Sequence, residues 1–399
     1  MTDMIYILLF LFLLVPVIRY DLLAKKGGED LWYWTSVILL VLVAGLRYRV
    51  GGDTLVYMAE YNMYPKIDEL AYFDFETARY NPLWYIIASV ARSIDDSFTC
   101  FQIFHALIVN ISFFHFFRKY CPRYYFSAIL VWFVGYWCYF SFEVLREVLC
   151  ISLLLWCIDF LLEKKYLRYY LMCAVALFIH YSAVIMLFFP LLPLVFRRPN
   201  WKFQVLILGA VVLFTMVVNI PSLIVGLLSL DDQLETVIEN YFENDMKNIV
   251  GKLFEIFRYL PVLGTVWLRE RNQLEDEYDF MPIVSLMVVF YGLSSYLGVA
   301  GRFLNYMAPF FVVMFVNTVY DILSEVNWRE RHVTSIIALC AVVILSFNYL
   351  RYYLKDTSDV YPGTHAYCIF VPYHSVFNPQ VDNTRESYVE NLRDFAIIF

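Results

Sequence analysis

Long apolar stretches alternate with short polar segments along the whole chain. A helix that crosses a membrane needs about 20 predominantly apolar residues, and several stretches approach that length. They are residues 4–18, 31–46, 98–117, 124–140, 146–162, 203–228, 280–300, 303–322 and 333–350. The pattern predicts an all-α polytopic membrane protein. We expect the first stretch to stay as a helix, because no basic segment precedes it and no A-x-A-like cleavage site follows it.

Three further stretches are ambiguous in length. Residues 81–94 and 256–268 are short, whereas residues 169–196 are too long for one ordinary span and are interrupted at His180. We expect 81–94 to form a re-entrant or interfacial helix, and 169–196 to form two short passes that meet near His180. The prediction is then about twelve transmembrane helices, with both termini on the same side of the membrane.

The basic residues set the orientation of these passes. One face receives sixteen of the 30 Lys and Arg residues, in six short loops. They are Arg19, Lys25, Lys26, Arg118, Lys119, Arg123, Lys164, Lys165, Arg168, Arg197, Arg198, Lys202, Arg269, Arg271, Arg329 and Arg331. Basic residues concentrate in short cytoplasmic loops, so this face is predicted to be cytoplasmic. The membrane domain would cover residues 1–350, and residues 351–399 would form a tail on the outer side.

The outer face is predicted to carry most of the polar chemistry. It receives the loop 47–97, the turn 141–146, the break at His180 and the loop 230–255. Apolar residues recur at helical spacing in the last of these loops, which predicts an amphipathic surface helix.

The composition narrows the class of protein further. Hydrophobic residues make up 61% of the chain and charged residues 17%, against about 45–50% apolar residues in soluble globular proteins. The net charge of −7 argues against a nucleic-acid partner, which would require a basic surface. The eight Cys residues include no CxxC pair, and the chain contains no Gly-rich phosphate loop. We therefore expect neither a metal site nor a cofactor.

Charged residues beside apolar spans are candidates for function, because a charge inside a membrane is costly. Arg47 and Arg49 follow the second apolar stretch, and the glycine pair 51–52 and Asp53 come directly after them. Two guanidinium groups beside flexible backbone suit a diphosphate, since Arg binds phosphate oxygens through paired hydrogen bonds. The alternative is an ordinary stop-transfer charge at a helix end, which the predicted outer position disfavours.

A second charged group lies at the start of the 146–162 stretch. Glu143, Arg146 and Glu147 are spaced three and four residues apart, so they share one helical face. One interpretation is an internal ion pair that neutralises Arg146. The other is an Arg146 that binds an anionic lipid headgroup, with a neighbouring carboxylate available as a base.

His180 and Arg302 are the remaining candidate functional residues on the predicted outer face. His180 is either a packing residue or a general base, and Arg302 lies where two apolar stretches meet. Together with the three earlier Arg residues, they predict an outward-facing anion site built from distant parts of the chain. Nearby aromatic residues would form an interfacial belt, and some of them could instead stack on sugar rings.

Five short motifs together resemble those of the EpsG family. They are AGLRYRVGGDTLVY, LRE, ALFIHYSAV, GRFLNYMAPF and VPYHS, in matching order between residues 40 and 378. Members of that family are polytopic inner-membrane proteins of exopolysaccharide, capsule and O-antigen loci, regarded as Wzy-type polymerases. The resemblance implies a metal-independent glycosyltransferase, with a GT-C-like arrangement as one candidate fold.

The expected reaction joins oligosaccharide repeat units carried on undecaprenyl diphosphate, which serves as both donor and acceptor. The resemblance places this reaction at the periplasmic face of the bacterial inner membrane. The distribution of basic residues separately predicts that both termini lie in the periplasm. Membrane lipid surrounds the protein, and a chain-length regulator is a candidate partner.

The resemblance also implies roles for individual residues. The base is expected to be His180, with Asp53 or Glu147 as alternatives. The diphosphate would be held by Arg47, Arg49, Arg146 and Arg302. Further substrate contacts are expected from Tyr57, Glu143, Ser182 and Tyr306. One departure is Glu147, which stands where the family commonly has Gln, so it would either pair with Arg146 or alter the substrate preference.

Other classes of protein would also use outward-facing arginines. A flippase or transporter of lipid-linked oligosaccharide should show repeat symmetry and charges at the membrane midplane, and the sequence shows neither. A membrane O-acyltransferase of surface glycans would receive its acyl group from the cytoplasmic side, away from the predicted position of His180. A scaffold for a polysaccharide-producing complex is a third alternative.

Thiol labelling of single Cys residues at positions 120, 200 and 375, in a background without native Cys, tests the orientation. We expect a membrane-impermeant reagent to label position 375 from outside, and to reach positions 120 and 200 only after permeabilisation. Labelling of positions 120 and 375 from the same side would contradict the predicted topology.

Overall fold

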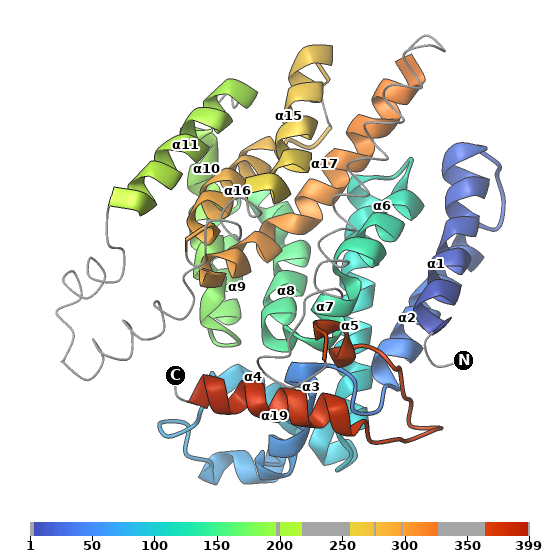
Figure 1. The fold of residues 1–399 in the computed structure, drawn as a ribbon, viewed down its shortest axis with the longest axis vertical. Helices are drawn as coiled ribbons and strands as arrows, with labels where there is room; N and C mark the ends of the chain where they lie inside the picture. The colour runs from blue at the N-terminus through green and yellow to red at the C-terminus, as the bar shows by residue number, and fades with distance from the viewer. Residues whose placement is uncertain are drawn as a thin grey trace. The chain divides into compact units, whose positions relative to one another are not determined.

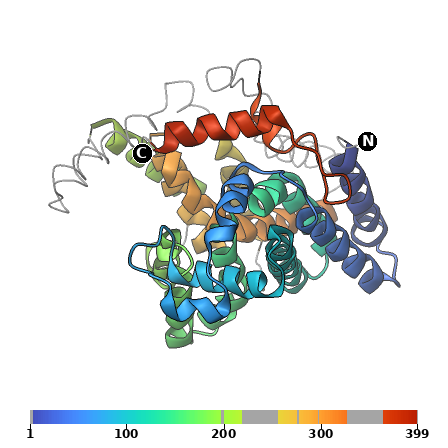
Figure 2. The same cartoon turned by 90° about the horizontal axis from the view of Figure 1, so that it is seen from below.

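The structure is a computed structural model (Figures 1 and 2). It describes residues 4–196, 200–217, 256–274, 277–296, 298–325 and 364–397. The chain divides into two compact units. The first comprises Met1–Pro190 and Tyr349–Leu392, and the second comprises Leu191–Asn348 and Arg393–Phe399. The predicted amphipathic loop 230–255 and the predicted span 333–350 lie outside the described residues.

The first unit is built from helices. They are α1 (Ile5–Pro16), α2 (Glu29–Gly45), α3 (Gly52–Glu60), α4 (Pro82–Ile94), α5 (Phe98–Tyr120), α6 (Tyr125–Trp132), α7 (Cys138–Phe142), α8 (Leu145–Leu162), α9 (Tyr166–Leu177) and the part of α19 (Asn383–Ile397) up to Leu392. A π-helical segment, Val17–Leu22, extends α1, and another, Phe133–Trp137, joins α6 to α7. Short 3-10 segments cover Tyr61–Met63, Ile67–Tyr72, Tyr181–Leu191 and Ala366–Ile369.

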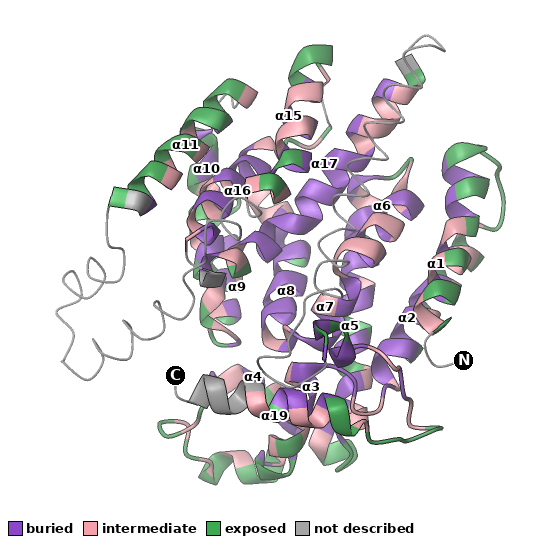
Figure 3. Ribbon diagram, in the orientation of Figure 1, coloured by how far each residue is buried: buried purple, intermediate pink, exposed green. Residues whose placement is uncertain are grey.

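Helix α5 forms the centre of this unit and packs against α2, α4, α6 and α8. Its aromatic residues fill the space between these neighbours, as shown by the stacking of Phe113 on Trp132 with ring centroids 4.7 Å apart. Both side chains are completely buried. Figure 3 shows that the buried residues of α5 and α8 face the interior of the unit, whereas α1 carries many exposed positions.

The two ends of α5 and α8 carry different sets of charged residues. At one end, Arg118 forms an ion pair with Asp30 at 2.6 Å, and Lys119 forms one with Asp159 at 2.5 Å. Both cations belong to the predicted cytoplasmic clusters. The opposite ends of the same helices begin at Phe98 and Leu145 and adjoin α3 and α4. Arg118 and Lys119 therefore lie at the end of these helices opposite α4, and the cytoplasmic location of that end stays a prediction.

The helical membrane character of the chain is confirmed. Among the described residues, four helices are long and apolar enough to cross a membrane: Ile5–Leu22, Phe98–Tyr120, Tyr125–Phe142 and Ala300–Ser324. Each matches a stretch that the hydrophobic pattern predicts. Shorter apolar helices cover Tyr166–Leu177, Tyr181–Val195, Trp201–Thr215 and Met281–Ser294. The count of twelve passes, the GT-C-like arrangement and the membrane position of α4 stay predictions.

The interruption of the 169–196 stretch at His180 is confirmed. Helix α9 ends at Leu177, and the chain then turns back. A hydrogen bond between the two arms shows this turn: the Tyr169 hydroxyl donates to the Met186 carbonyl at 2.9 Å. The two arms therefore run antiparallel. At about 1.5 Å per residue, the 12 residues of α9 extend over about 18 Å, which is less than the ~30 Å hydrocarbon core.

The second unit contains α10 (Leu192–Val195), α11 (Trp201–Val217), α15 (Leu260–Asn272), α16 (Met281–Ser294) and α17 (Leu304–Glu325), with a 3-10 turn at Gly298–Phe303. Helix α16 packs closely on α11, and the absence of a side chain at Gly292 allows this approach. A Cβ atom there would lie 2.7 Å from Val211. Buried polar groups link neighbouring segments: Gln204 donates to Ser285 at 3.0 Å and accepts a hydrogen bond from the Tyr259 hydroxyl.

The C-terminal segment docks on the loop that follows α2. The Tyr48 N–H donates to the His374 carbonyl at 2.8 Å, and the Val376 N–H donates to the Leu46 carbonyl at 2.9 Å. The completely buried guanidinium of Arg385 on α19 fixes this arrangement. It donates to three main-chain carbonyls, those of Cys368 and Arg49 at 2.7 Å and that of Pro372 at 2.5 Å.

Replacing Arg385 should destabilise the first unit. Arg385→Ala would leave three buried carbonyls without their donor, and the expected loss is on the order of 3 kcal/mol. Thermal unfolding of the detergent-solubilised protein should show a clear drop in Tm, together with faster proteolysis of the C-terminal segment. Arg123→Ala, at an exposed position, is the control. Equal Tm values for the two variants would contradict the docking role of Arg385.

Candidate functional site

The candidate site begins where the loop between α2 and α3 meets the turn between α7 and α8. Gly51 has φ of +105°, a backbone conformation that side chains disfavour. A Cβ atom there would lie 2.6 Å from the Phe142 carbonyl oxygen. The Thr54 hydroxyl donates to the same carbonyl at 2.9 Å. The glycine therefore allows two predicted motifs, 91 residues apart at Gly52 and Glu143, to pack backbone to backbone.

Glu143 caps the N-terminus of α3. Its carboxylate accepts hydrogen bonds from the N–H groups of Gly52 at 2.7 Å and Asp53 at 3.3 Å. A carboxylate in this position satisfies unpaired N–H groups and complements the helix dipole. Burial of Glu143, followed by the nearby charge of Asp53, raises the pKa of Glu143 above its ordinary value. The side chain predicted to touch substrate thus positions α3.

Arg47 makes its hydrogen bonds inside the protein. Its side chain is 1% exposed, and its guanidinium donates to the carbonyls of Ala44 and of Val50 (3.2 Å) and to the Thr54 hydroxyl at 2.9 Å. The same group lies over the Phe142 ring at 4.8 Å. These contacts tie α2, α3 and the α7–α8 turn together. The predicted binding of diphosphate by Arg47 stays a prediction, and it would compete with these bonds.

Arg49 has a carboxylate partner that the sequence did not indicate. Its Nε and Nη2 atoms each lie 2.5 Å from an oxygen of Glu386 on α19. This paired hydrogen bond raises the pKa of Arg49 above its ordinary value. Its role as a ligand of diphosphate also stays a prediction, and it would require the Glu386 carboxylate to share or yield the guanidinium.

Arg146 differs from both of these arginines. It lies in the first turn of α8, its Nε donates to the Tyr57 hydroxyl at 2.8 Å, and its guanidinium stacks over the Tyr80 ring at 4.3 Å. Among the residues that the structure describes, Arg146 forms no ion pair, so the predicted internal ion pair with Glu143 or Glu147 is not present there. The Arg146 side chain is partly exposed and is oriented by two tyrosines, so its guanidinium could contact an anionic ligand.

The break at His180 lies at the same end of α8 as Arg146. The Asn81 amide donates to the Leu177 carbonyl at 2.9 Å, and the Leu83 N–H donates to the Phe178 carbonyl at 2.9 Å. These two bonds join the end of α9 to the start of α4, directly after Tyr80. Sequence spacing could not have shown this link, which places the end of α9 beside the segment that carries Tyr80, the residue on which Arg146 stacks.

The hydrogen bonds of His180 define its neutral form. Its Nδ1 accepts the Ser182 backbone N–H at 3.1 Å and lies 2.7 Å from the Ser182 hydroxyl oxygen. A backbone N–H can only donate, so the neutral ring carries its proton on Nε2. The basic nitrogen of this form, Nδ1, is therefore engaged by Ser182.

The remaining predicted residues fall into different environments. Asp53 and Tyr57 lie one turn apart on the same face of α3, and Asp53 is partly exposed. Glu147 is 3% exposed. Arg302 and Tyr306 belong to the second unit, where Arg302 is exposed and Tyr306 is fully buried. The convergence of Arg302 with the other arginines stays a prediction.

Within the described ranges, no group of three or more His, Cys, Asp or Glu residues is arranged to hold a metal ion. The functional interactions that the sequence missed involve Tyr80, Arg385 and Glu386. Tyr80 is one aromatic residue among many in its loop, and the two residues of α19 lie in an ordinary polar segment, so no local signal marks them.

Comparison with known proteins gives one match. The family model described as EpsG family matches residues 30–364, a range that includes α3, Arg146 and His180. No curated protein and no solved structure matches the chain.

The close contact at Gly51 can be tested with a matched glycine. Gly51→Ala introduces both backbone strain, on the order of 1–3 kcal/mol, and a clash with Phe142. Gly27→Ala introduces strain alone, because Gly27 also has positive φ but has nothing within 4 Å of an added Cβ. Thermal unfolding should show a larger loss for Gly51→Ala. A loss no larger than that of Gly27→Ala would contradict the packing at Phe142.

Proposed function

The chain belongs to the EpsG family, and from this membership and the site around α3 we propose that it is a polysaccharide polymerase. The family makes it a polysaccharide-related membrane protein. The proposed reaction joins oligosaccharide repeat units that are carried on undecaprenyl diphosphate, at the periplasmic face of the inner membrane. Both the donor and the acceptor are lipid-linked in this proposal.

The observation that carries the proposal is the state of Arg146. A guanidinium that lies in a fixed position without a carboxylate partner among the described residues is suited to bind an anionic group, since Arg forms paired hydrogen bonds with phosphate oxygens. Tyr57 and Tyr80 orient it through a hydrogen bond and a stacked ring. The proposed ligand is the diphosphate of the donor.

The reaction needs little beyond orientation and charge stabilisation. The acceptor hydroxyl attacks the anomeric carbon of the donor sugar, and a new glycosidic C–O bond forms as the bond from that carbon to the diphosphate oxygen breaks. The bonding electrons leave with undecaprenyl diphosphate. Arg146 would stabilise the negative charge that develops on the leaving group, a contribution that a metal ion can also make where one is bound.

The geometry favours Asp53 as the base. In the neutral form of His180 the basic nitrogen is Nδ1, which already accepts the Ser182 N–H, so His180 is less suited than Asp53 to remove a proton. Asp53 is partly exposed and lies on the face of α3 that carries Tyr57, the partner of Arg146. In the proposal, Asp53 takes the proton of the acceptor hydroxyl, and Glu147, which is almost completely buried, does not.

Removal of Arg146 tests the proposal. Arg146→Ala should abolish long polymer, because the loss of one such charge-stabilising donor reduces the rate by about 10²–10³. The matched control is Arg79→Ala: Arg79 contacts the same Tyr80 ring but is 60% exposed and already paired with Glu60 at 2.6 Å. Polymer length on a polysaccharide gel is the readout, with membrane levels of each variant measured by immunoblot.

The expected pattern is loss of long polymer with single-unit product retained for Arg146→Ala, and near-normal polymer for Arg79→Ala. Wild-type chain lengths in Arg146→Ala would defeat the assignment. Loss of all surface glycan would instead indicate a flippase, and intact polymer without acyl groups would indicate an acyltransferase.

A further inference from the structure

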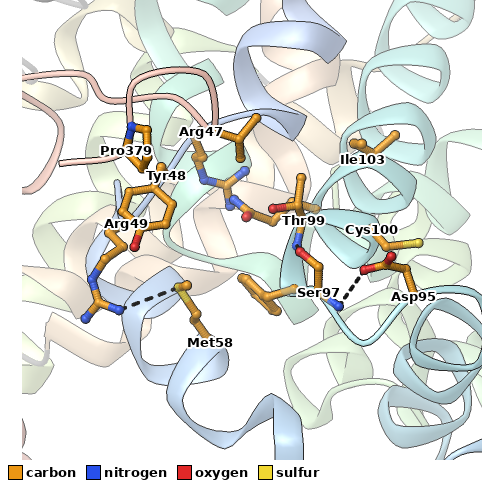
Figure 4. Close-up of a pocket in the computed structure, with 13 residues that line it drawn as sticks. Arg47, Tyr48, Arg49, Met58, Asp95, Ser97, Thr99, Cys100, Ile103 and Pro379 are labelled. Carbon is orange, nitrogen blue, oxygen red and sulfur yellow. Dashed lines mark hydrogen bonds between the residues drawn. The ribbon is translucent and has the colours of Figure 1, made fainter. Parts of the chain in front are cut away.

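A second feature of the first unit lies beside α3 but apart from Arg146. It is a cavity of about 720 Å³ between the loop that follows α2 and the start of α5. Figure 4 shows Tyr48 and Arg49 on one side of this cavity and Ser97, Thr99 and Asp95 on the other. Its volume falls within the range typical of small-molecule sites.

The cavity and the Arg146 site occupy different faces of α3. Met58 lines the cavity, whereas Tyr57, which holds Arg146, does not. Successive helix residues are about 100° apart around the axis, so Thr54 and Met58 lie on a different face from Asp53 and Tyr57. The protein therefore has two separate places, on two sides of one helix, at which substrate groups could bind.

The charges around the cavity do not favour a phosphate. Arg47 is satisfied by internal hydrogen bonds, and Arg49 is paired with Glu386 through two of its nitrogen atoms. The exposed carboxylate of Asp95, which accepts the Ser97 N–H at 2.6 Å, would repel an anion. The cavity thus offers little positive charge that is not already compensated.

The other lining groups suit a neutral, hydroxyl-rich ligand. Tyr48 and Phe98 provide aromatic rings, and the Thr99 hydroxyl and the buried Gln102 amide provide polar groups among them. Gln102, with its oxygen facing Arg47, accepts hydrogen bonds from Nε at 3.1 Å and Nη1 at 3.2 Å. A polar group fixed in this way at the buried part of a partly aromatic cavity gives orientation as well as affinity.

We propose that this cavity binds the carbohydrate part of a substrate, separately from the diphosphate that Arg146 holds. The sugar rings pack their C–H faces on the aromatic groups, and their hydroxyls bond to Thr99 and Gln102. This inference rests on the proposed polymerase function for the identity of the sugar-bearing substrate. In this proposal the sugar binds on the side of α3 that carries Met58, and the diphosphate binds on the side that carries Tyr57. The two groups belong either to one lipid-linked substrate or to the donor and the acceptor.

The test is direct binding of a lipid-free oligosaccharide to the purified full-length protein in nanodiscs, by calorimetry. The probe is the repeat-unit oligosaccharide obtained by partial hydrolysis of the producing strain's own polysaccharide. Thr99→Val removes only the hydroxyl, and Tyr48→Leu removes the aromatic ring. Each should weaken binding by about tenfold, the equivalent of one lost polar or stacking contact. Thr35→Val, on α2 outside the cavity, is the matched control.

Arg146→Ala and inorganic pyrophosphate separate this inference from the proposed function. Arg146→Ala should bind the oligosaccharide as tightly as the wild type while losing long polymer, and pyrophosphate should not displace the oligosaccharide. Unchanged binding in both Thr99→Val and Tyr48→Leu would overturn the inference, as would displacement by pyrophosphate. If the wild type binds no oligosaccharide but Arg146→Ala still abolishes polymer, the inference fails and the polymerase proposal stands.

Discussion

The contact between the Glu143 carboxylate and the first N–H groups of α3 is the interaction on which the rest of the site depends. It fixes the start of a nine-residue helix against the turn between α7 and α8, and the absence of a side chain at Gly51 allows the two backbones to approach. Tyr57 then lies where it can accept the hydrogen bond of Arg146. Because one helix carries both Tyr57 and Met58, its placement sets the contact of Tyr57 with Arg146 and one wall of the neighbouring cavity.

Desolvation determines which arginine is available to a ligand. A buried guanidinium is costly unless each nitrogen has an acceptor. Arg385 meets that requirement with three main-chain carbonyls, and Arg47 meets it with two carbonyls and the Thr54 hydroxyl. Arg49 has an acceptor for two of its three nitrogens, Nε and Nη2, in the carboxylate of Glu386. Arg146 is instead partly exposed and stacks on an aromatic ring, and among the described residues it has no carboxylate partner. Arg47, Arg49 and Arg146 look alike in the sequence, but the structure places them in different environments.

The sequence predicted the elements that depend on local or periodic signals. The apolar stretches and the break at His180 follow from hydrophobic length, and the charges beside the spans marked Arg47 and Arg146 as candidates without showing that their segments pack together. The individual partners could not be predicted, because they depend on main-chain carbonyls of the folded protein and on Glu386, which is 337 residues from Arg49. The tautomer of His180 depends on a single backbone N–H, for which residue type carries no signal.

In the proposed function, this chain alone catalyses polymerisation through Arg146. The most direct measurement is reconstitution of the purified protein in liposomes with undecaprenyl-diphosphate-linked repeat units as the only other component, in buffer containing a metal chelator. With the wild type we expect polymer longer than one repeat and release of undecaprenyl diphosphate, and with Arg146→Ala we expect the loss of both. Absence of polymer with the wild type, or equal polymer with the two proteins, would contradict the proposed function.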